Sequence, residues 1–213
     1  MSSTSNNDGN EVTDTDSTDN SDDDTSNNDK KDILDEVLPI DIACQRHQQP
    51  TESDISVLTN GIPPIHFLFL PQCYRDNESR ECTIDYIISS FPNNAAVYHD
   101  GKLPLHQACK VKASLETLKK ILNIYPNGIT QETTNNNDTA LHCYLSSSKT
   151  STNQETKKTV TFLVDKNVDV LTVQNNNGWY PIHIVAYRNQ PIEIIYYLAK
   201  NAPVTIIRNE QIH

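Results

Sequence analysis

A motif of six residues that occurs four times constrains the fold of this 213-residue chain more than any other feature. It reads GIPPIH at 61–66, GKLPLH at 101–106, NDTALH at 137–142 and GWYPIH at 178–183, so its closing histidines are 40, 36 and 41 residues apart. Three of the chain's five glycines and one asparagine hold the first position, and both residue types readily adopt a positive φ. A tight turn is therefore expected where each motif begins.

A short helix is expected inside each motif. Pro64, Pro104 and Pro181 occupy the fourth position, and Pro is favoured at the first residue of a helix, where its missing N–H is not needed. The residue before it becomes the N-cap, and only Thr139 carries a side chain that caps helices well. Each motif thus predicts a turn that leads directly into a helix.

A second, apolar helical stretch follows each motif and ends near Pro or Asn, which commonly stop helices. These stretches cover 84–91, 115–125, 160–164 and 192–200. Polar inserts at 72–82 and 146–158 separate the two helices of their units, and such inserts are expected to form surface loops. Each unit therefore consists of a turn, a helix, a second helix and a stop signal.

The stop signals Pro92-Asn93 and Pro126-Asn127 are 34 residues apart, and the polar inserts account for the longest histidine spacings. Repetition with a period of about 33 residues and a helix start like T-P-L-H is typical of ankyrin repeats, and residues 60–213 resemble that family. The resemblance implies an all-α solenoid of helix-turn-helix units. A single unit cannot bury its own apolar face, and stacking of the units forms the core. It predicts an ankyrin-repeat domain over 32–213, with four repeats at about 60–213. The weaker match LPIDIACQ at 38–45 predicts a partial or capping unit over 32–59.

The N-terminal end has a different composition. Residues 1–31 contain no aromatic and almost no aliphatic side chain, so we expect a disordered acidic tail rich in Ser, Thr, Asp and Asn. Residues 1–35 carry ten Asp and one Glu against two Lys, a net charge of −9 out of −11 for the chain. The nearly neutral remainder argues against nucleic-acid binding, which needs a basic face.

Membrane insertion and secretion are not expected either. The chain has no run of about 18 apolar residues, and its N-terminus lacks the apolar core of a signal peptide. Its five cysteines are odd in number and form no C-x-x-C pair, which favours reduced thiols in the cytoplasm or the nucleus.

The motif histidines raise the question of a metal or catalytic site. Copies one repeat apart are about 10 Å from each other in a stack of helices. Ligands of one zinc ion lie about 2 Å from the metal, so neighbouring histidines cannot share it. The resemblance implies instead that each histidine ties turn to helix and unit to unit. Without a glycine-rich phosphate loop or a paired-carboxylate site, we expect no enzyme, no catalytic residue, no metal and no cofactor.

The resemblance implies a protein partner on the concave surface of the stack, bound by residues beside each turn and by the fourth and fifth residues after each histidine. The candidate contacts are His99, Asp100, Lys102, Lys110, Val111, Asn135, Asn136, Asp138, Ser146, Ser147, Asn176, Asn177, Trp179, Tyr187 and Arg188. Trp, Tyr and Arg dominate interface hot spots, which favours the last unit. The structural alternative is that Trp179 packs on a neighbouring turn.

Two other functions remain open at this point. The acidic tail could bind basic proteins while the repeats act as a spacer, or the chain could be a regulatory fragment of a larger enzyme. Removing 1–31 would separate the first alternative from binding by the repeats.

An apolar stripe on the last helical stretch consists of Ile192, Ile195 and Tyr196. Such a stripe predicts an association surface at the C-terminal edge, covered by a second subunit, a partner or a further repeat.

Overall fold

The computed structural model describes residues 62–69, 77–149 and 151–203. Every described residue belongs to one unit, Val37–His213. The predicted tail at 1–31, the predicted capping unit at 32–59 and the first turn residue, Gly61, lie outside the described residues.

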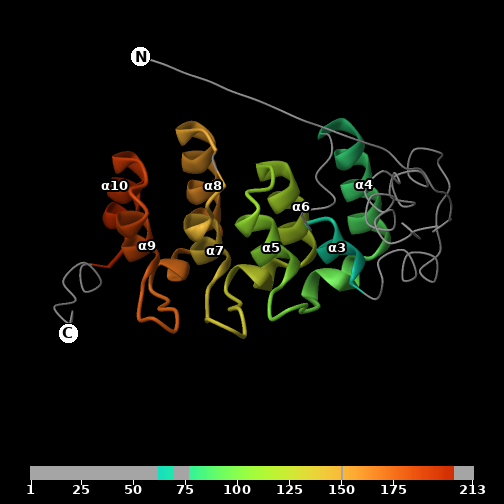
Figure 1. Ribbon diagram of the computed structural model, residues 1–213, viewed down its shortest axis with the longest axis horizontal. Coiled ribbons are helices and arrows are strands. Elements are labelled where there is room, and N and C mark those ends of the chain that lie inside the picture. Colours follow the sequence, from blue (N-terminus) through green and yellow to red (C-terminus); the bar gives the residue numbers. More distant parts are fainter. Residues whose placement is uncertain (1–61, 70–76, 150, 204–213) are drawn as a thin grey trace, which may run out of the picture. The chain divides into compact units, whose positions relative to one another are not determined.

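Eight α-helices stand in four consecutive pairs within the described residues, side by side in chain order (Figure 1). The inner helices are α3 (Pro64–Phe67), α5 (Pro104–Lys110), α7 (Ala140–Ser146) and α9 (Pro181–Tyr187). The outer helices are α4 (Asn77–Ser90), α6 (Leu115–Ile124), α8 (Asn153–Lys166) and α10 (Ile192–Asn201). Inner helices pack on inner helices and outer on outer, which confirms the predicted all-α stack of helix pairs.

Short 3-10 helices end three of the units and lead to the next turn. They are η2 (Pro92–Ala96), η3 (Pro126–Ile129) and η4 (Val168–Leu171). The described part of the chain forms no β-strand, and its only bridges are two isolated ones that close turns, His99 with Lys102 and Glu132 with Thr139.

The turn residues adopt the conformation that the motif predicts. Gly101, Asn137 and Gly178 have φ values of 71°, 52° and 73°. At Gly101 a Cβ atom would also lie 2.5 Å from Oγ1 of Thr134 in the next turn, so a side chain there would displace the side chains of Thr134 and Asn135. A Cβ atom on Gly178 would meet nothing within 4 Å, so this glycine is needed for its backbone conformation alone.

The predicted helix starts at proline are confirmed, whereas two predicted loops are partly wrong. Pro64, Pro104 and Pro181 are the first residues of α3, α5 and α9. The inserts at 72–82 and 146–158, however, end in helix, since α4 begins at Asn77 and α8 at Asn153. Both outer helices are therefore longer than their apolar stretches.

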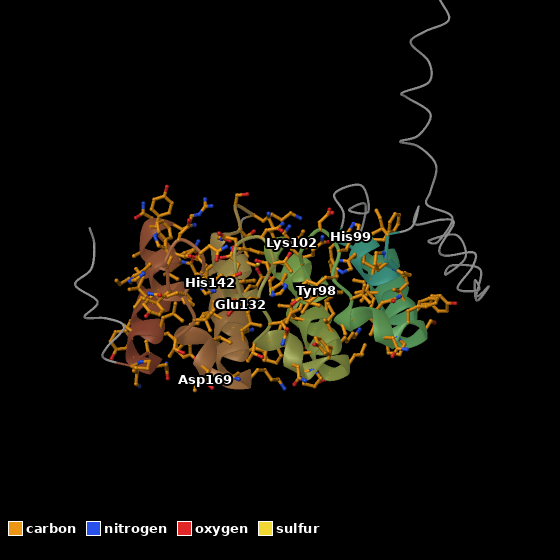
Figure 2. All side chains as sticks on the ribbon, turned by 90° about the horizontal axis from the view of Figure 1, so that it is seen from below. Tyr98, His99, Lys102, Glu132, His142 and Asp169 are labelled. Carbon is orange, nitrogen blue, oxygen red and sulfur yellow. The ribbon has the colours of Figure 1, made fainter. Side chains whose placement is uncertain are left out.

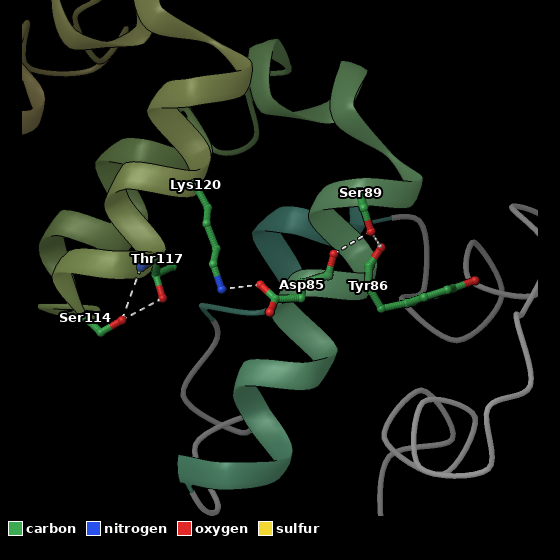
Figure 3. Close-up of polar contacts among 6 residues, drawn as sticks. All are labelled: Asp85, Tyr86, Ser89, Ser114, Thr117 and Lys120. Carbon is green, nitrogen blue, oxygen red and sulfur yellow. Dashed lines mark hydrogen bonds and ion pairs between the residues drawn. The ribbon is translucent and has the colours of Figure 1, made fainter.

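A reciprocal cap explains the early start of α8. The Thr152 hydroxyl accepts the Glu155 N–H at 3.2 Å, and the Glu155 carboxylate accepts the Thr152 N–H at 3.1 Å. This capping box satisfies two amides that the first turn of a helix leaves without partners. A simpler cap starts α6, where the Ser114 hydroxyl accepts the Thr117 N–H at 3.2 Å (Figure 3).

Leu and Ile side chains from every pair form one continuous core. Fully buried members include Ile65, Ile87, Leu105, Leu118, Leu141, Leu163, Ile194 and Leu198. Burying one such side chain stabilises a fold by roughly 1.5–3 kcal/mol. The ion pair between Lys120 of α6 and Asp85 of α4 is largely exposed and adds less than about 1 kcal/mol (Figure 3). Apolar stacking, not surface charge, holds neighbouring pairs together.

Candidate functional site

The motif histidines connect consecutive units through their Nε2 atoms. Each of the first three is fully buried and lies within hydrogen-bond distance of a backbone carbonyl in the following unit. The pairs are His66 with Val97 at 2.8 Å, His106 with Gln131 at 3.0 Å and His142 with Trp179 at 3.0 Å. A carbonyl only accepts hydrogen bonds, so Nε2 carries the proton and donates. This confirms the structural role that the resemblance implied for the histidines.

The other ring nitrogen ties the turn to the helix. Nδ1 accepts the backbone N–H of the residue three positions earlier, from Leu103 to His106 at 3.0 Å and from Thr139 to His142 at 3.3 Å. The Thr139 hydroxyl also lies 2.8 Å from Nδ1 of His142 and donates to it. Thr139 thus occupies the N-cap position, as predicted, and directs its hydroxyl to the histidine.

His66 breaks this pattern because Pro63, three residues earlier, has no N–H. Its buried Nδ1 has no hydrogen-bond partner within the described residues. The Gln107 side chain is close enough to raise the pKa of His66, yet burial dominates and lowers that pKa. Nδ1 of His66 therefore lacks the hydrogen bond that the same atom makes in His106 and His142.

Burial keeps these imidazoles neutral. Desolvation lowers the pKa of His142 and of His66, and it lowers the pKa of His106 to about 4. In His106 and His142 both ring nitrogens are already hydrogen-bonded within the stack. Across the described ranges, no group of three or more His, Cys, Asp or Glu side chains could hold a metal ion.

Two predicted contact residues, Asn136 and Asp138, hold the turns together. Asp138 accepts the Asn175 amide through Oδ1 at 2.9 Å and the Asn136 amide through Oδ2 at 2.7 Å. The Asn136 carbonyl accepts the Asn176 N–H at 2.9 Å. Both side chains therefore have a structural role that the sequence analysis did not assign to them.

Four other candidate side chains also make hydrogen bonds or packing contacts within the stack. The Ser147 hydroxyl is buried and donates to the Lys110 carbonyl at 2.6 Å, and Val111 packs against the core. The Asn135 amide donates to the Asp100 carbonyl at 3.3 Å. Ser146 is half-buried and donates to the Cys143 carbonyl at 3.2 Å.

The sequence analysis missed Asn175, the centre of the last turn. It is almost fully buried, and its Oδ1 accepts the N–H groups of Asn177 and Trp179 at 3.0 and 3.1 Å. The run NNNG at 175–178 carried the signal, because Asn side chains commonly bond their own backbone two residues on.

We group the remaining candidates under the name inner-helix face, after the helices that they flank. It consists of turn residues and of residues at the ends of α5 and α9, namely His99, Asp100, Lys102, Lys110, Asn177, Trp179, Tyr187 and Arg188. Figure 2 shows His99 and Lys102 along the edge formed by the inner helices, with Asp169 at the opposite edge.

The charges of Lys102 and Lys110 both act on a buried thiol of the next inner helix. Burial raises the pKa of the Cys143 thiol in α7 to about 12, and the charges of Lys110 and Lys102 oppose that rise. Both ammonium groups are thus near enough to act on the next inner helix. Lys102 also donates to the Asp100 carbonyl at 3.3 Å.

An aromatic pair lies at the C-terminal end of the inner-helix face. The rings of Trp179 and Tyr187 meet edge to face with centroids 5.0 Å apart. Trp179 is half-buried and packs against the core, whereas Tyr187 is 69% exposed and Arg188 is exposed. Trp179 therefore packs within its own unit, and its contact with a partner stays a prediction.

The C-terminal edge is partly apolar. Ile192 and Tyr196 on α10 are each 69% exposed, as their place in the predicted stripe requires. Ile195 is half-buried and packs against the core, so its assignment to an uncovered stripe was wrong in part. His183, at the same end, is only half-buried, and its Nε2 has no partner in the described part of the chain.

Comparison with protein families gives a match over residues 105–209 to the model described as ankyrin repeats (3 copies). The match begins inside α5, so the pair α3 and α4 lies before it. No curated protein and no solved structure matches the chain. None of the described helices is long and apolar enough to cross a membrane.

Proposed function

The chain is an ankyrin-repeat protein, and we propose that it binds a protein partner through its inner-helix face. Ankyrin repeats are in general protein–protein interaction modules and typically not enzymes. Repeat stacks present extended surfaces of this kind because each unit contacts only its neighbours. The proposal includes no catalytic residue and no cofactor.

The observation that carries this proposal is the exposed aromatic and cationic group in the last unit. Tyr187 presents most of its ring to solvent while its edge-to-face contact with Trp179 holds it in place. Arg188 follows directly and is exposed. Tyr, Trp and Arg are the residue types that most often dominate binding energy at interfaces.

We expect Tyr187→Ala to weaken binding of the partner by about 2 kcal/mol, or roughly 30-fold, without unfolding the stack. The partner is first captured with the wild-type full chain, and its affinity for each variant is then measured by titration. Val168→Ala is the control, because Val168 is 52% exposed and lies on η4, outside both the inner-helix face and the C-terminal edge. Equal affinities for the two variants, or equal losses, would contradict the proposed surface.

The tail supports a second candidate function, because residues 1–35 carry a net charge of −9. Replacing the Asp residues of 1–31 with Asn in the full chain separates the two candidates. Binding by the inner-helix face survives this replacement, whereas binding of basic proteins by the tail does not.

We also propose that the C-terminal edge associates with a second copy of the chain. The exposed side chains of Ile192 and Tyr196 on the last outer helix support this. Light scattering of the wild-type full chain is expected to show an average mass that rises with concentration. The double variant Ile192→Lys/Tyr196→Glu is expected to stay monomeric. A wild-type protein that remains monomeric at high concentration would refute the proposal.

The cytoplasm or the nucleus is the proposed location. Cys109 and Cys143 are buried free thiols, and burial raises the pKa of both. Reduced, unreactive thiols suit a reducing compartment.

A further inference from the structure

The last outer helix, α10, differs from the outer helices before it in what it presents to solvent (Figure 1). Every exposed residue of α6 and of α8 is polar or charged. Of the large apolar side chains that are exposed in the described part of the chain, only Ile192 and Tyr196 lie on an outer helix. Exposed apolar side chains that gather on one element are typical of an association surface.

Two charged residues share this side of α10. Glu193 and Lys200 are both exposed. With 3.6 residues per turn, the exposed residues lie within about 100° of arc around the helix axis, and the buried Ile194 and Leu198 lie on the opposite side. We call the exposed set the α10 stripe; it consists of Ile192, Glu193, Tyr196 and Lys200.

The two charges of the α10 stripe do not pair with each other. Glu193 and Lys200 are about 10 Å apart along the helix axis, whereas side chains that meet on a helix are three or four residues apart. Within the described residues, neither forms an ion pair with any other side chain. The helix dipole favours an acid in the first turn and a base in the last turn, which explains their order but gives neither of them a partner.

We infer that α10 of one copy packs antiparallel on α10 of a second copy, about a two-fold axis that passes beside Tyr196. Positions 193 and 200 are equally far from such an axis, so Glu193 of each copy meets Lys200 of the other. A two-fold contact uses the same patch on both copies, so both ion pairs form together while the Tyr196 side chains meet at the centre. This specifies the geometry of the self-association proposed above and rests on that proposal.

Charge complementarity is the reason for choosing a second copy in this orientation. The α10 stripe has an acid near one end, a base near the other and apolar side chains beside them, so it complements itself when it is turned end for end. Parallel packing about a two-fold axis would place Glu193 against Glu193 and Lys200 against Lys200, which is unfavourable. The net charge of −11 opposes association of two copies, so we expect a weak dimer that forms at high concentration.

Single charge reversals test the orientation. Dimerisation of the full chain is measured by analytical ultracentrifugation over a range of concentrations. Glu193→Lys and Lys200→Glu are each expected to weaken the dimer roughly tenfold or more, because each reversal creates two like-charge contacts across the axis. A general effect of net charge would instead act in opposite directions, since the first variant is less acidic than the wild type and the second is more acidic.

The control for Lys200→Glu is Lys157→Glu. It changes the net charge in the same way on an exposed residue of α8, and it is expected to weaken the dimer by less than about twofold. Circular dichroism spectra check that all variants are folded.

Mixing the two single variants provides the decisive measurement. In a dimer of one Glu193→Lys chain with one Lys200→Glu chain, each reversed charge meets an opposite one, so an equal mixture is expected to dimerise about as tightly as the wild type. The double variant Glu193→Lys/Lys200→Glu restores both pairs within one sequence and is expected to do the same.

The outcomes separate this inference from the proposal on which it rests. A wild-type chain that stays monomeric would overturn both, and it would mean that another part of the chain or a different protein covers this side of α10. A wild-type chain that associates, with single variants no weaker than Lys157→Glu or with a mixture that does not recover, would overturn the antiparallel geometry alone. In that case self-association stands and uses another orientation.

Discussion

Replacing His106 with Ala is expected to destabilise the stack by about 3–5 kcal/mol. The ring is fully buried, accepts the Leu103 N–H and donates to the Gln131 carbonyl, both at 3.0 Å. Its removal leaves two backbone groups without partners, which costs roughly 1–3 kcal/mol for each buried group, and adds a cavity. Because repeats depend on their neighbours, the loss is expected to lower the stability of the whole array.

His183→Ala is the matched control for this prediction. His183 occupies the same motif position, but it is half-buried and makes one described hydrogen bond, from the Tyr180 N–H at 3.3 Å. Its replacement is expected to cost about 1 kcal/mol. Urea unfolding followed by far-ultraviolet circular dichroism measures both variants. Equal destabilisation would show that the bond to the following unit contributes nothing.

The inner helices could be predicted closely because their determinants are local. A residue with positive φ, a proline at the first helical position and a histidine at the third act within six residues of one another. The lengths of the outer helices were harder to predict, because α4 and α8 begin before their apolar stretches. The capping box of Thr152 and Glu155 was present in the sequence, and it would have extended α8 into the polar insert.

The candidate site was harder to predict, because its residues depend on contacts between units. Asp138 and Asn175 are 37 residues apart and meet only when two turns stack. The sequence pattern of one unit does not distinguish a residue that contacts the next turn, such as Asp138, from an exposed residue such as Tyr187. The unsatisfied Nδ1 of His66 could have been inferred, since Pro63 removes the N–H that the motif's histidine accepts.

Mild acid is expected to unfold the stack through its buried histidines. An unfolded histidine has a pKa near 6.5, whereas burial lowers the pKa of His66 and His142 and lowers that of His106 to about 4. Between these values the unfolded chain binds more protons than the folded chain, so stability falls as the pH falls. The contribution of His106 is fully present above pH 6.5, is about 2 kcal/mol smaller at pH 5, and is about 3 kcal/mol smaller once the pH reaches its folded pKa.

The slope of stability against pH tests this origin directly. Each buried histidine that takes up a proton on unfolding contributes about 1.4 kcal/mol per pH unit between its two pKa values. Urea unfolding of the full chain at several pH values between 5 and 6 gives the slope, and few carboxyl groups titrate in that range. His106→Ala is expected to reduce the slope by about one proton, because the variant loses one of the contributing rings. An unchanged slope would mean that His106 is protonated in the folded protein. That outcome would contradict the structure, in which a neutral His106 donates from Nε2 to the Gln131 carbonyl and accepts the Leu103 N–H at Nδ1.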